Sequence, residues 1–158
     1  SETKEILIDI KTINNKGKII NINKKNLNLD YRQSQLPEGD IILSANFHCD
    51  YGDKNEITKK MNEIKIYREK TQPLKEKTSG STFKNPKNNF AAKLIEMSNC
   101  KGLSEGGIFV SNKHANFLIN KQQGNANQIE ELGNKIIEKV YNKFKIKLEW
   151  EIKIIGQK

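Results

Sequence analysis

The stretch at residues 78–86 (TSGSTFKNP) places a hydroxyl, an ammonium and a carboxamide close together in the sequence. Gly80 lets the backbone turn tightly or approach a ligand closely, so Ser81 is presented on a bend rather than along a face. Pro86 ends the extended segment and biases Asn85 away from helix. Such a turn can hold a polar ligand, and a plain loop whose serine has no chemical role is the alternative.

Ser81 is a poor acid or nucleophile at its free pKa, and it needs activating neighbours or a very basic proton acceptor. Ser81 is not the serine of a Gly-x-Ser-x-Gly motif, and neither His48 nor His114 stands in a recognisable triad. The pattern therefore does not favour a hydrolase.

Arginine is rare in this chain. Of 28 Lys and Arg residues only Arg32 and Arg68 are arginine. A guanidinium is planar and always charged, and it can bind a carboxylate or an enolate through two parallel hydrogen bonds. For Arg32 the alternatives are a pairing with Asp30 or with solvent.

Two carboxylates, Glu149 and Glu151, flank Trp150 in the last alternating segment of the chain. One of them is expected to point inward or toward a cleft, where it needs a partner and could stabilise an enol or relay a proton. A solvated glutamate at a sheet edge is the alternative for each.

The net charge of +9 raises the question of a polyanionic partner. The lysines are spread over every segment, and only Trp150 offers a large stacking surface, so specific nucleic-acid recognition is not expected.

No apolar run approaches the roughly 18 residues of a membrane span, and no membrane partner is expected. Cys49 and Cys100 form no motif, and with two histidines they supply no zinc-ligand set, so no metal site is expected.

Apolar periodicity predicts an α+β fold. Residues 5–14, 18–22 and 41–47 read as antiparallel strands, followed by a helix at 56–70. A short helix at 89–97, strands at 108–111 and 116–120, a long helix at 128–144 and a last strand at 148–155 follow. The expected domain boundary lies near residues 48–55.

Short motifs follow one another in a fixed order from residue 31 to residue 156. They are Tyr31-Arg32-x-Ser34, Gln72-Pro73-Leu74, Gly80-Ser81-x-Phe83-Lys84-Asn85-Pro86, Ala92-x-Leu94-Ile95-Glu96, Lys101-Gly102, Gly106-Gly107, Val110-Ser111-x-x-His114-Ala115-x-Phe117, Ile119-Asn120 and Leu148-x-x-Glu151-Ile152-Lys153-Ile154-Ile155-Gly156. The ordered set resembles the UDP-N-acetylenolpyruvoylglucosamine reductases, the MurB family of peptidoglycan precursor synthesis.

The resemblance implies that residues 1–50 are the remainder of an antiparallel β-rich FAD-binding domain. Residues 55–158 would form the C-terminal α+β substrate-binding domain, in the branch of the family without an inserted tyrosine-bearing loop. It also implies FAD as cofactor, NADPH as reductant and the bacterial cytoplasm as location. The main flavin site is expected in an N-terminal region that precedes this chain, so the chain alone is expected to be inactive.

The family's roles fall on residues that match its motifs. Arg32 and Glu151 would stabilise the enolate that forms when the enolpyruvyl group of UDP-N-acetylglucosamine enolpyruvate is reduced, and Ser81 would protonate it. Glu149 would be the outward neighbour of Glu151. The resemblance assigns contacts with the UDP-sugar to five further residues: Tyr31, Arg68, Asn85, Lys101 and His114.

Two other functions stay open at the level of sequence. One is a truncated or split gene product that holds a UDP-sugar or works with an N-terminal half in trans. The other is a basic domain that binds polyanions, whose affinity would collapse with salt.

Overall fold

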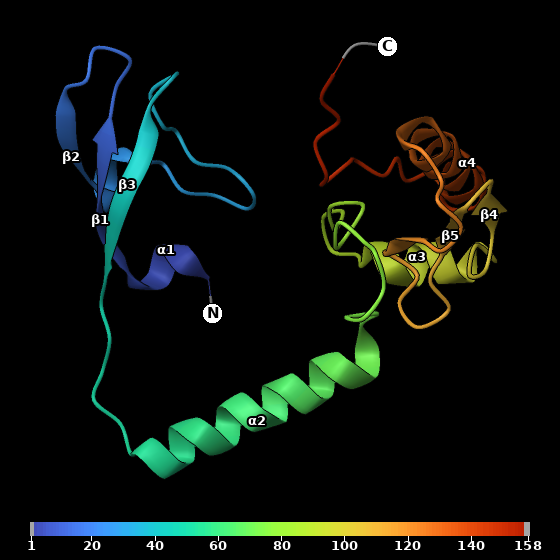
Figure 1. Cartoon of the computed structure of the whole chain (residues 1–158), viewed down its shortest axis with the longest axis horizontal. Coiled ribbons are helices and arrows are strands. Elements are labelled where there is room, and N and C mark those ends of the chain that lie inside the picture. The colour runs from blue at the N-terminus through green and yellow to red at the C-terminus, as the bar shows by residue number, and fades with distance from the viewer. Residues whose placement is uncertain (1, 157–158) are drawn as a thin grey trace. The chain divides into compact units, whose positions relative to one another are not determined.

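A three-stranded antiparallel sheet forms the first part of the chain (Figure 1). Its strands are β1 (Leu7–Ile13), β2 (Ile19–Asn23) and β3 (Ile41–Phe47), in the order β2-β1-β3. The structure is a computed structural model that describes residues 2–156. The three predicted strands are confirmed, except that the first begins two residues late because the short helix α1 (Thr3–Ile6) precedes it.

The hairpin between β1 and β2 closes on Asn14 and Gly17. The amide of Asn14 donates to the carbonyl of Lys18 at 3.1 Å, and Gly17 has a φ of +75°, a value that glycine adopts without strain. A single 3-10 turn, η1 (Lys24–Asn26), follows β2 and brings Leu27 against Leu7 and Ile10. These three side chains are the buried cluster of this sheet, whereas every residue of β3 is exposed.

The predicted helix at 56–70 is α2 (Lys54–Thr71). The side chain of Asp53 accepts hydrogen bonds from the amides of Asn55 and Glu56 and so caps its first turn. The apolar stripe that predicted this helix, which includes Met61 and Tyr67, is exposed. The chain divides into two compact units, Ser1–Ile57 and Thr58–Lys158, within the first turn of α2.

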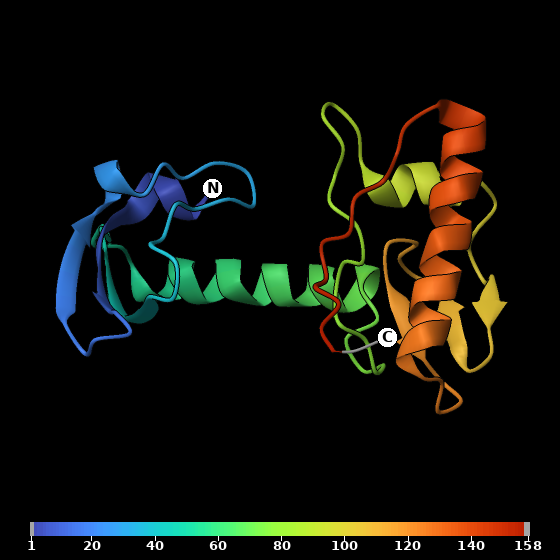
Figure 2. The same ribbon diagram turned by 90° about the horizontal axis from the view of Figure 1, so that it is seen from above.

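The second unit combines an antiparallel sheet with two helices (Figure 2). Strands β4 (Ser104–Glu105), β5 (Ile108–Val110) and β6 (Leu118–Asn120) lie in the order β4-β5-β6. Helices α3 (Ala91–Met97) and α4 (Ala126–Phe144) pack against each other, and α4 also packs against β4 and β5. The core between sheet and helices contains Phe83, Leu94, Ile95, Ile108, Val110, Leu132, Ile136, Val140 and Leu148.

Helix α4 confirms the predicted long helix and begins two residues before its predicted start. Asn125 and Gln128 form a reciprocal capping box, in which each side chain accepts a hydrogen bond from the other residue's amide. The helix ends at Lys145, whose φ of +58° breaks the helical backbone. The apolar positions Leu132, Ile136 and Val140 are buried, as the 3.6-residue period indicates.

The prediction of a regular strand at 148–155 is wrong, because this segment forms no ladder. It makes an isolated bridge between Trp150 and Phe83, and bends follow at Glu151 and Ile152. Alternation alone could not show this, because the neighbouring segment at residues 81–84 is itself short and irregular. The α+β class is confirmed, and no helix within residues 2–156 is long and apolar enough to cross a membrane.

Gly133 lets α4 approach Trp150. A Cβ atom at this buried position would overlap the indole ring. We expect Gly133→Ala to lower the free energy of unfolding by about 1–3 kcal/mol, because overpacking outweighs the better helix propensity of alanine. Urea denaturation measures the effect, with Asn134→Ala, at the exposed neighbouring position, as the control. A Gly133→Ala variant as stable as this control would contradict the packing.

Candidate functional site

Ser81 lies in a segment that two other segments hold from opposite sides. On one side it bridges to Phe117, and the amide of Thr82 donates to the carbonyl of Asn116 at 2.8 Å. On the other side the amide of Glu151 donates to the carbonyl of Thr82 at 2.9 Å. Ser81 precedes Thr82 in the chain and the backbone of Glu151 is hydrogen-bonded to Thr82, so the structure brings the backbones of these two predicted residues close together.

The bend before Ser81 has the predicted geometry. Gly80 has a φ of +89°, and its amide donates to Oγ1 of Thr78 at 3.3 Å. A left-handed φ of this kind favours glycine over residues that carry a Cβ. The bend leaves Ser81 half-buried, at the start of the segment that enters the core at Phe83.

The two glutamates differ in environment. Glu149 has a side chain that is 74% exposed and pairs with Lys84, with 3.5 Å between Oε2 and Nζ. Glu151 is half-buried, and its Oε2 atom is shielded from solvent. Residues two apart share one face of a regular strand, and the bends that begin at Glu151 are what give the two carboxylates different surroundings.

Tyr31 and Arg32 occupy the corner of a tight turn in the first unit. Asp30 and Gln33 exchange two backbone hydrogen bonds of 3.1 Å across it, and Asp30 Oδ1 accepts from the amide of Tyr31 at 2.7 Å. Arg32 has a φ of +56°, an uncommon value for a residue with a side chain, and its guanidinium lies 5.5 Å from the centre of the Tyr31 ring. The turn borders a cavity of about 440 Å³.

Arg32 belongs to the first unit, whereas Ser81 and Glu151 belong to the second. The expected meeting of all three in one site stays a prediction.

Asn85 and Lys101 make contacts within the second unit. Oδ1 of Asn85 accepts from the amide of Ala91 at 3.0 Å, at the first residue of α3. Nζ of Lys101 pairs with Oε1 of Glu96 at 2.6 Å. Arg68 lies in the last turn of α2, where its carbonyl accepts from the amide of Gln72. A contact of each of these residues with a ligand stays a prediction.

His114 is half-buried in the turn before β6. Its ring packs edge-on against Phe117, with 4.7 Å between the ring centres, and its Nδ1 accepts from the amide of Asn116 at 3.3 Å. Burial, helped by the charge of Lys101, lowers the pKa of His114 below its ordinary value of 6.5. His114 is therefore neutral at pH 7, and the accepting role of Nδ1 places its proton on Nε2.

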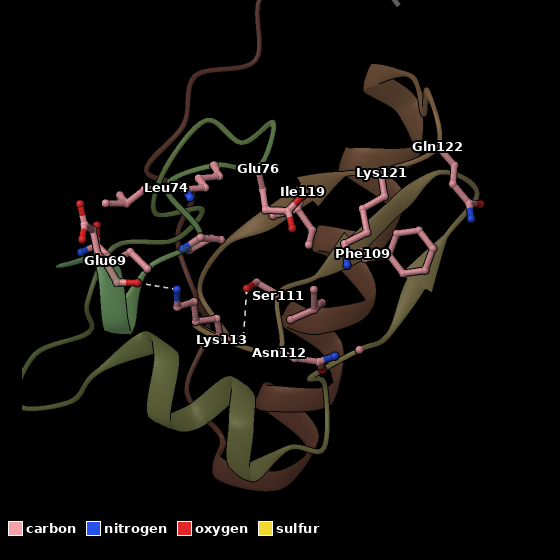
Figure 3. A pocket seen from close by; sticks show the side chains of 15 residues that line it. Glu69, Leu74, Glu76, Phe109, Ser111, Asn112, Lys113, Ile119, Lys121 and Gln122 are labelled. Atoms are coloured by element: carbon pink, nitrogen blue, oxygen red, sulfur yellow. Dashed lines mark hydrogen bonds between the residues drawn. The ribbon is translucent and has the colours of Figure 1, made fainter. Parts of the chain in front are cut away.

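A cavity of about 1040 Å³ lies in the second unit (Figure 3). The loop after α2 supplies Leu74 and Glu76, and β5 and β6 supply Phe109 and Ile119. Phe109 and Ile119 are paired across the two strands, and the neighbouring pair Val110 and Leu118 is part of the core. Since successive residues point to opposite faces, the cavity lies on the sheet face away from the core.

Three lysines line this cavity: Lys75, Lys113 and Lys121. The Nζ atom of Lys113 donates to the carbonyl of Glu69 at the end of α2, and its amide donates to Oγ of Ser111 at 3.2 Å (Figure 3). The sequence analysis missed these lysines because they are far apart along a chain with lysine in every segment. The sequence nevertheless held a signal for the position of the cavity. Three residues predicted to contact the ligand are each next to a residue that lines it: Arg68 before Glu69, Lys101 before Gly102 and His114 after Lys113.

A solved structure shares this fold. The crystal structure of UDP-N-acetylenolpyruvylglucosamine reductase (MurB) from Thermus caldophilus superimposes with a TM-score of 0.80 and 31% sequence identity. The match covers 94% of this chain and 53% of that chain. The fold is thus an α+β fold found in a reductase.

Sequence comparisons narrow the class to one family. The family model described as UDP-N-acetylenolpyruvoylglucosamine reductase, C-terminal domain, matches residues 72–155. Proteins named UDP-N-acetylenolpyruvoylglucosamine reductase from Rickettsia conorii and Novosphingobium aromaticivorans are each 40% identical over 99% of this chain. The chain belongs to the UDP-N-acetylenolpyruvoylglucosamine reductase (MurB) family, as its ordered motifs predict. It spans about half the length of these relatives, 53% and 52% respectively.

Proposed function

We propose that this chain is part of an enzyme that reduces UDP-N-acetylglucosamine enolpyruvate to UDP-N-acetylmuramate. Family membership supports the reaction. One observation carries the proposal. Ser81 directly precedes Thr82, and the carbonyl of Thr82 accepts a hydrogen bond from the amide of Glu151 at 2.9 Å.

Each of three residues has a role in this proposal. Reduction adds a hydride to the terminal vinyl carbon and leaves negative charge on the neighbouring carbon and its carboxylate. Arg32 stabilises this enolate through two parallel hydrogen bonds, and Glu151 does so as a carboxyl that donates its O–H to the enolate, since fixed polar groups are most effective where charge develops. Ser81 donates its hydroxyl proton to the neighbouring carbon, because an enolate of a carboxylate is basic enough to take it.

FAD and NADPH enter the proposal from the family resemblance. Backbone amides of a glycine-rich turn that opens a helix commonly hold the pyrophosphate of a dinucleotide. In residues 2–156 the one pair of adjacent glycines, Gly106-Gly107, precedes strand β5 rather than a helix. The described residues do not fit the FAD pyrophosphate, so we propose that the part of the relatives' length outside this chain binds the flavin.

The two parts of the chain have different proposed roles. Residues 1–50 would complete a flavin-binding domain and present Tyr31 and Arg32. Residues 55–158 would bind the UDP-sugar, with Arg68, Asn85, Lys101 and His114 in contact with it.

The cavity described above is the proposed place for the diphosphate of the substrate. Its three lysines outnumber the two lining glutamates, Glu69 and Glu76, so the lining carries one net positive charge, and Ser111 and Asn112 supply polar groups beside them. Phe109 and Ile119 form an apolar wall that suits a base or sugar face. A volume of about 1040 Å³ is at the upper end of the range typical of small-ligand sites.

Binding of the substrate to this chain tests the proposal. We expect calorimetric titration with UDP-N-acetylglucosamine enolpyruvate to show saturable binding that Lys121→Ala weakens by about tenfold, the contribution of one charge-assisted hydrogen bond. Lys139→Ala, on an exposed position of α4, is the matched control that removes equal charge.

The same titration with DNA at low and high salt separates a specific site from polyanion binding. Equal weakening by both substitutions, with loss of all binding at high salt, would contradict a substrate site and favour the polyanion-binding alternative.

A further inference from the structure

We infer that Asn116 is a positioning residue for the proposed reaction: it fixes residues 81–83, and through them sets Ser81 relative to Glu151. The hydrogen bonds of Asn116 support the geometry of this inference. Its effect on catalysis rests on the proposed function. Asn116 does not need to touch the substrate to act in this way.

The side chain of Asn116 takes the place of a neighbouring strand. It is 4% exposed, and its Oδ1 accepts from the amide of Phe83 at 3.0 Å while its Nδ2 donates to the carbonyl of Phe83 at 2.8 Å. Two residues paired in an antiparallel ladder exchange the same two kinds of hydrogen bond. Phe83 is 1% exposed, so loss of this amide would leave buried peptide groups without these partners.

The backbone of Asn116 holds the preceding residue. Its carbonyl accepts from the amide of Thr82 at 2.8 Å, and the carbonyl of Thr82 accepts from the amide of Glu151 at 2.9 Å. Ser81 directly precedes Thr82 and bridges to Phe117, the residue after Asn116. A shift of Asn116 therefore moves Ser81 and the amide contact of Glu151 together.

The turn before β6 fixes Asn116 itself. Its amide donates to Nδ1 of His114 at 3.3 Å, and the amide of Phe117 donates to the carbonyl of His114 at 3.0 Å. Asn116 thus uses its amide, its carbonyl and both polar atoms of its side chain in defined hydrogen bonds. This pattern requires an acceptor and a donor on one short side chain, which asparagine supplies and aspartate, when ionised, does not.

The chain contains a matched control for this arrangement. Asn120, at the other end of β6, accepts from the amide of Gly124 at 2.9 Å and donates to its carbonyl at 2.7 Å. The side chains of the two asparagines make the same pair of hydrogen bonds with one residue's backbone, but the side chain of Asn120 holds the loop before α4 rather than the segment that carries Ser81. The contact of Asn120 with Lys77 uses its backbone amide, which Asn120→Asp retains.

Asn116→Asp and Asn120→Asp, in the flavin-loaded whole reductase, test the inference. We expect Asn116→Asp to lower kcat about a hundredfold with little change in KM, because small misplacements of reacting groups have effects of this size. Asn120→Asp is expected to leave kcat within about threefold. Hydrogen exchange of the amides of Thr82 and Phe83 is expected to quicken in Asn116→Asp and not in Asn120→Asp.

A pH profile distinguishes positioning from damage to the fold. A protonated carboxyl offers one acceptor and one O–H donor, so it can reproduce both contacts with Phe83. Since burial raises the pKa of a carboxyl, kcat of Asn116→Asp relative to the unsubstituted enzyme is expected to recover as the pH falls from about 8 to about 6.

Equal kcat losses in the two variants, or unchanged exchange of the Thr82 and Phe83 amides, would overturn the positioning role. Failure of the unsubstituted, flavin-loaded protein to reduce the substrate would instead reject the proposed function, and the catalytic part of this inference with it. The rate of the unsubstituted protein thus separates the two failures.

Discussion

Ser81→Ala in the flavin-loaded whole reductase is expected to slow reduction of the enolpyruvyl substrate by about a thousandfold, the middle of the range for loss of a general acid. The substitution removes the hydroxyl and little else, since the bend before the half-buried Ser81 is defined by the φ of Gly80 and by the hydrogen bond from the amide of Gly80 to Oγ1 of Thr78, neither of which involves the Ser81 side chain. The hydrogen bonds of Thr82 with Asn116 and Glu151 involve backbone atoms and remain. The loss is therefore expected in the protonation step rather than in folding.

Two measurements isolate this step. Reduction of the flavin by NADPH, followed by its absorbance, is expected to proceed at the unsubstituted rate. Ser79→Ala removes an exposed hydroxyl two residues away and is expected to leave both half-reactions intact. Equal slowing of both half-reactions by Ser81→Ala would reject the proton-donor role.

Local patterns predicted most of the regular elements. The strand predicted at 41–47 is β3, and the 3.6-residue period at 128–144 lies within α4, with a capping box at its start. In these segments propensity, periodicity and end signals agree, so tertiary packing has little to override.

Tertiary packing decides which face of α3 is buried and whether β4 forms. The spacing within residues 89–97 predicts Phe90, Leu94 and Met97 on the apolar face of a short helix. Leu94 is buried, but Phe90 and Met97 are exposed, and Ala91 and Ile95 are buried instead. A helix of 7 residues is too short for its period to fix which side faces the core. The two-residue strand β4 likewise exists through its pairing with β5 and leaves no pattern of its own.

The candidate site residues were indicated by family motifs and not by local spacing, and their roles stay predictions. Ser81 and Glu151 come from segments far apart in sequence, and the family motifs indicated both. The lysines of the large cavity were not predicted, because their common feature is a place on one sheet face and not a spacing. Asn116 was missed for a related reason: its importance lies in four hydrogen-bonding atoms, which no residue pattern displays.

Glu151→Gln is expected to lower kcat by about a hundredfold or more, the loss seen when one fixed stabilising group is removed from a developing charge. Glutamine preserves the size of the side chain and one oxygen acceptor, and the hydrogen bond from the amide of residue 151 to Thr82 does not involve the side chain. The substitution thus removes the acidic O–H that would stabilise the enolate from a half-buried position whose Oε2 is shielded from solvent.

Glu149→Gln is the matched control, because it makes the same chemical change two residues away. The side chain of Glu149 is 74% exposed and pairs with Lys84 at 3.5 Å, and exposed ion pairs of this kind contribute little. We expect its kcat to stay within about twofold of the unsubstituted enzyme. A larger loss in Glu149→Gln than in Glu151→Gln, measured at saturating substrate, would show that the outer carboxylate faces the reaction. Glu149 rather than Glu151 would then be the reactive carboxyl, and the proximity of Ser81 and Glu151 would have no role in the reaction.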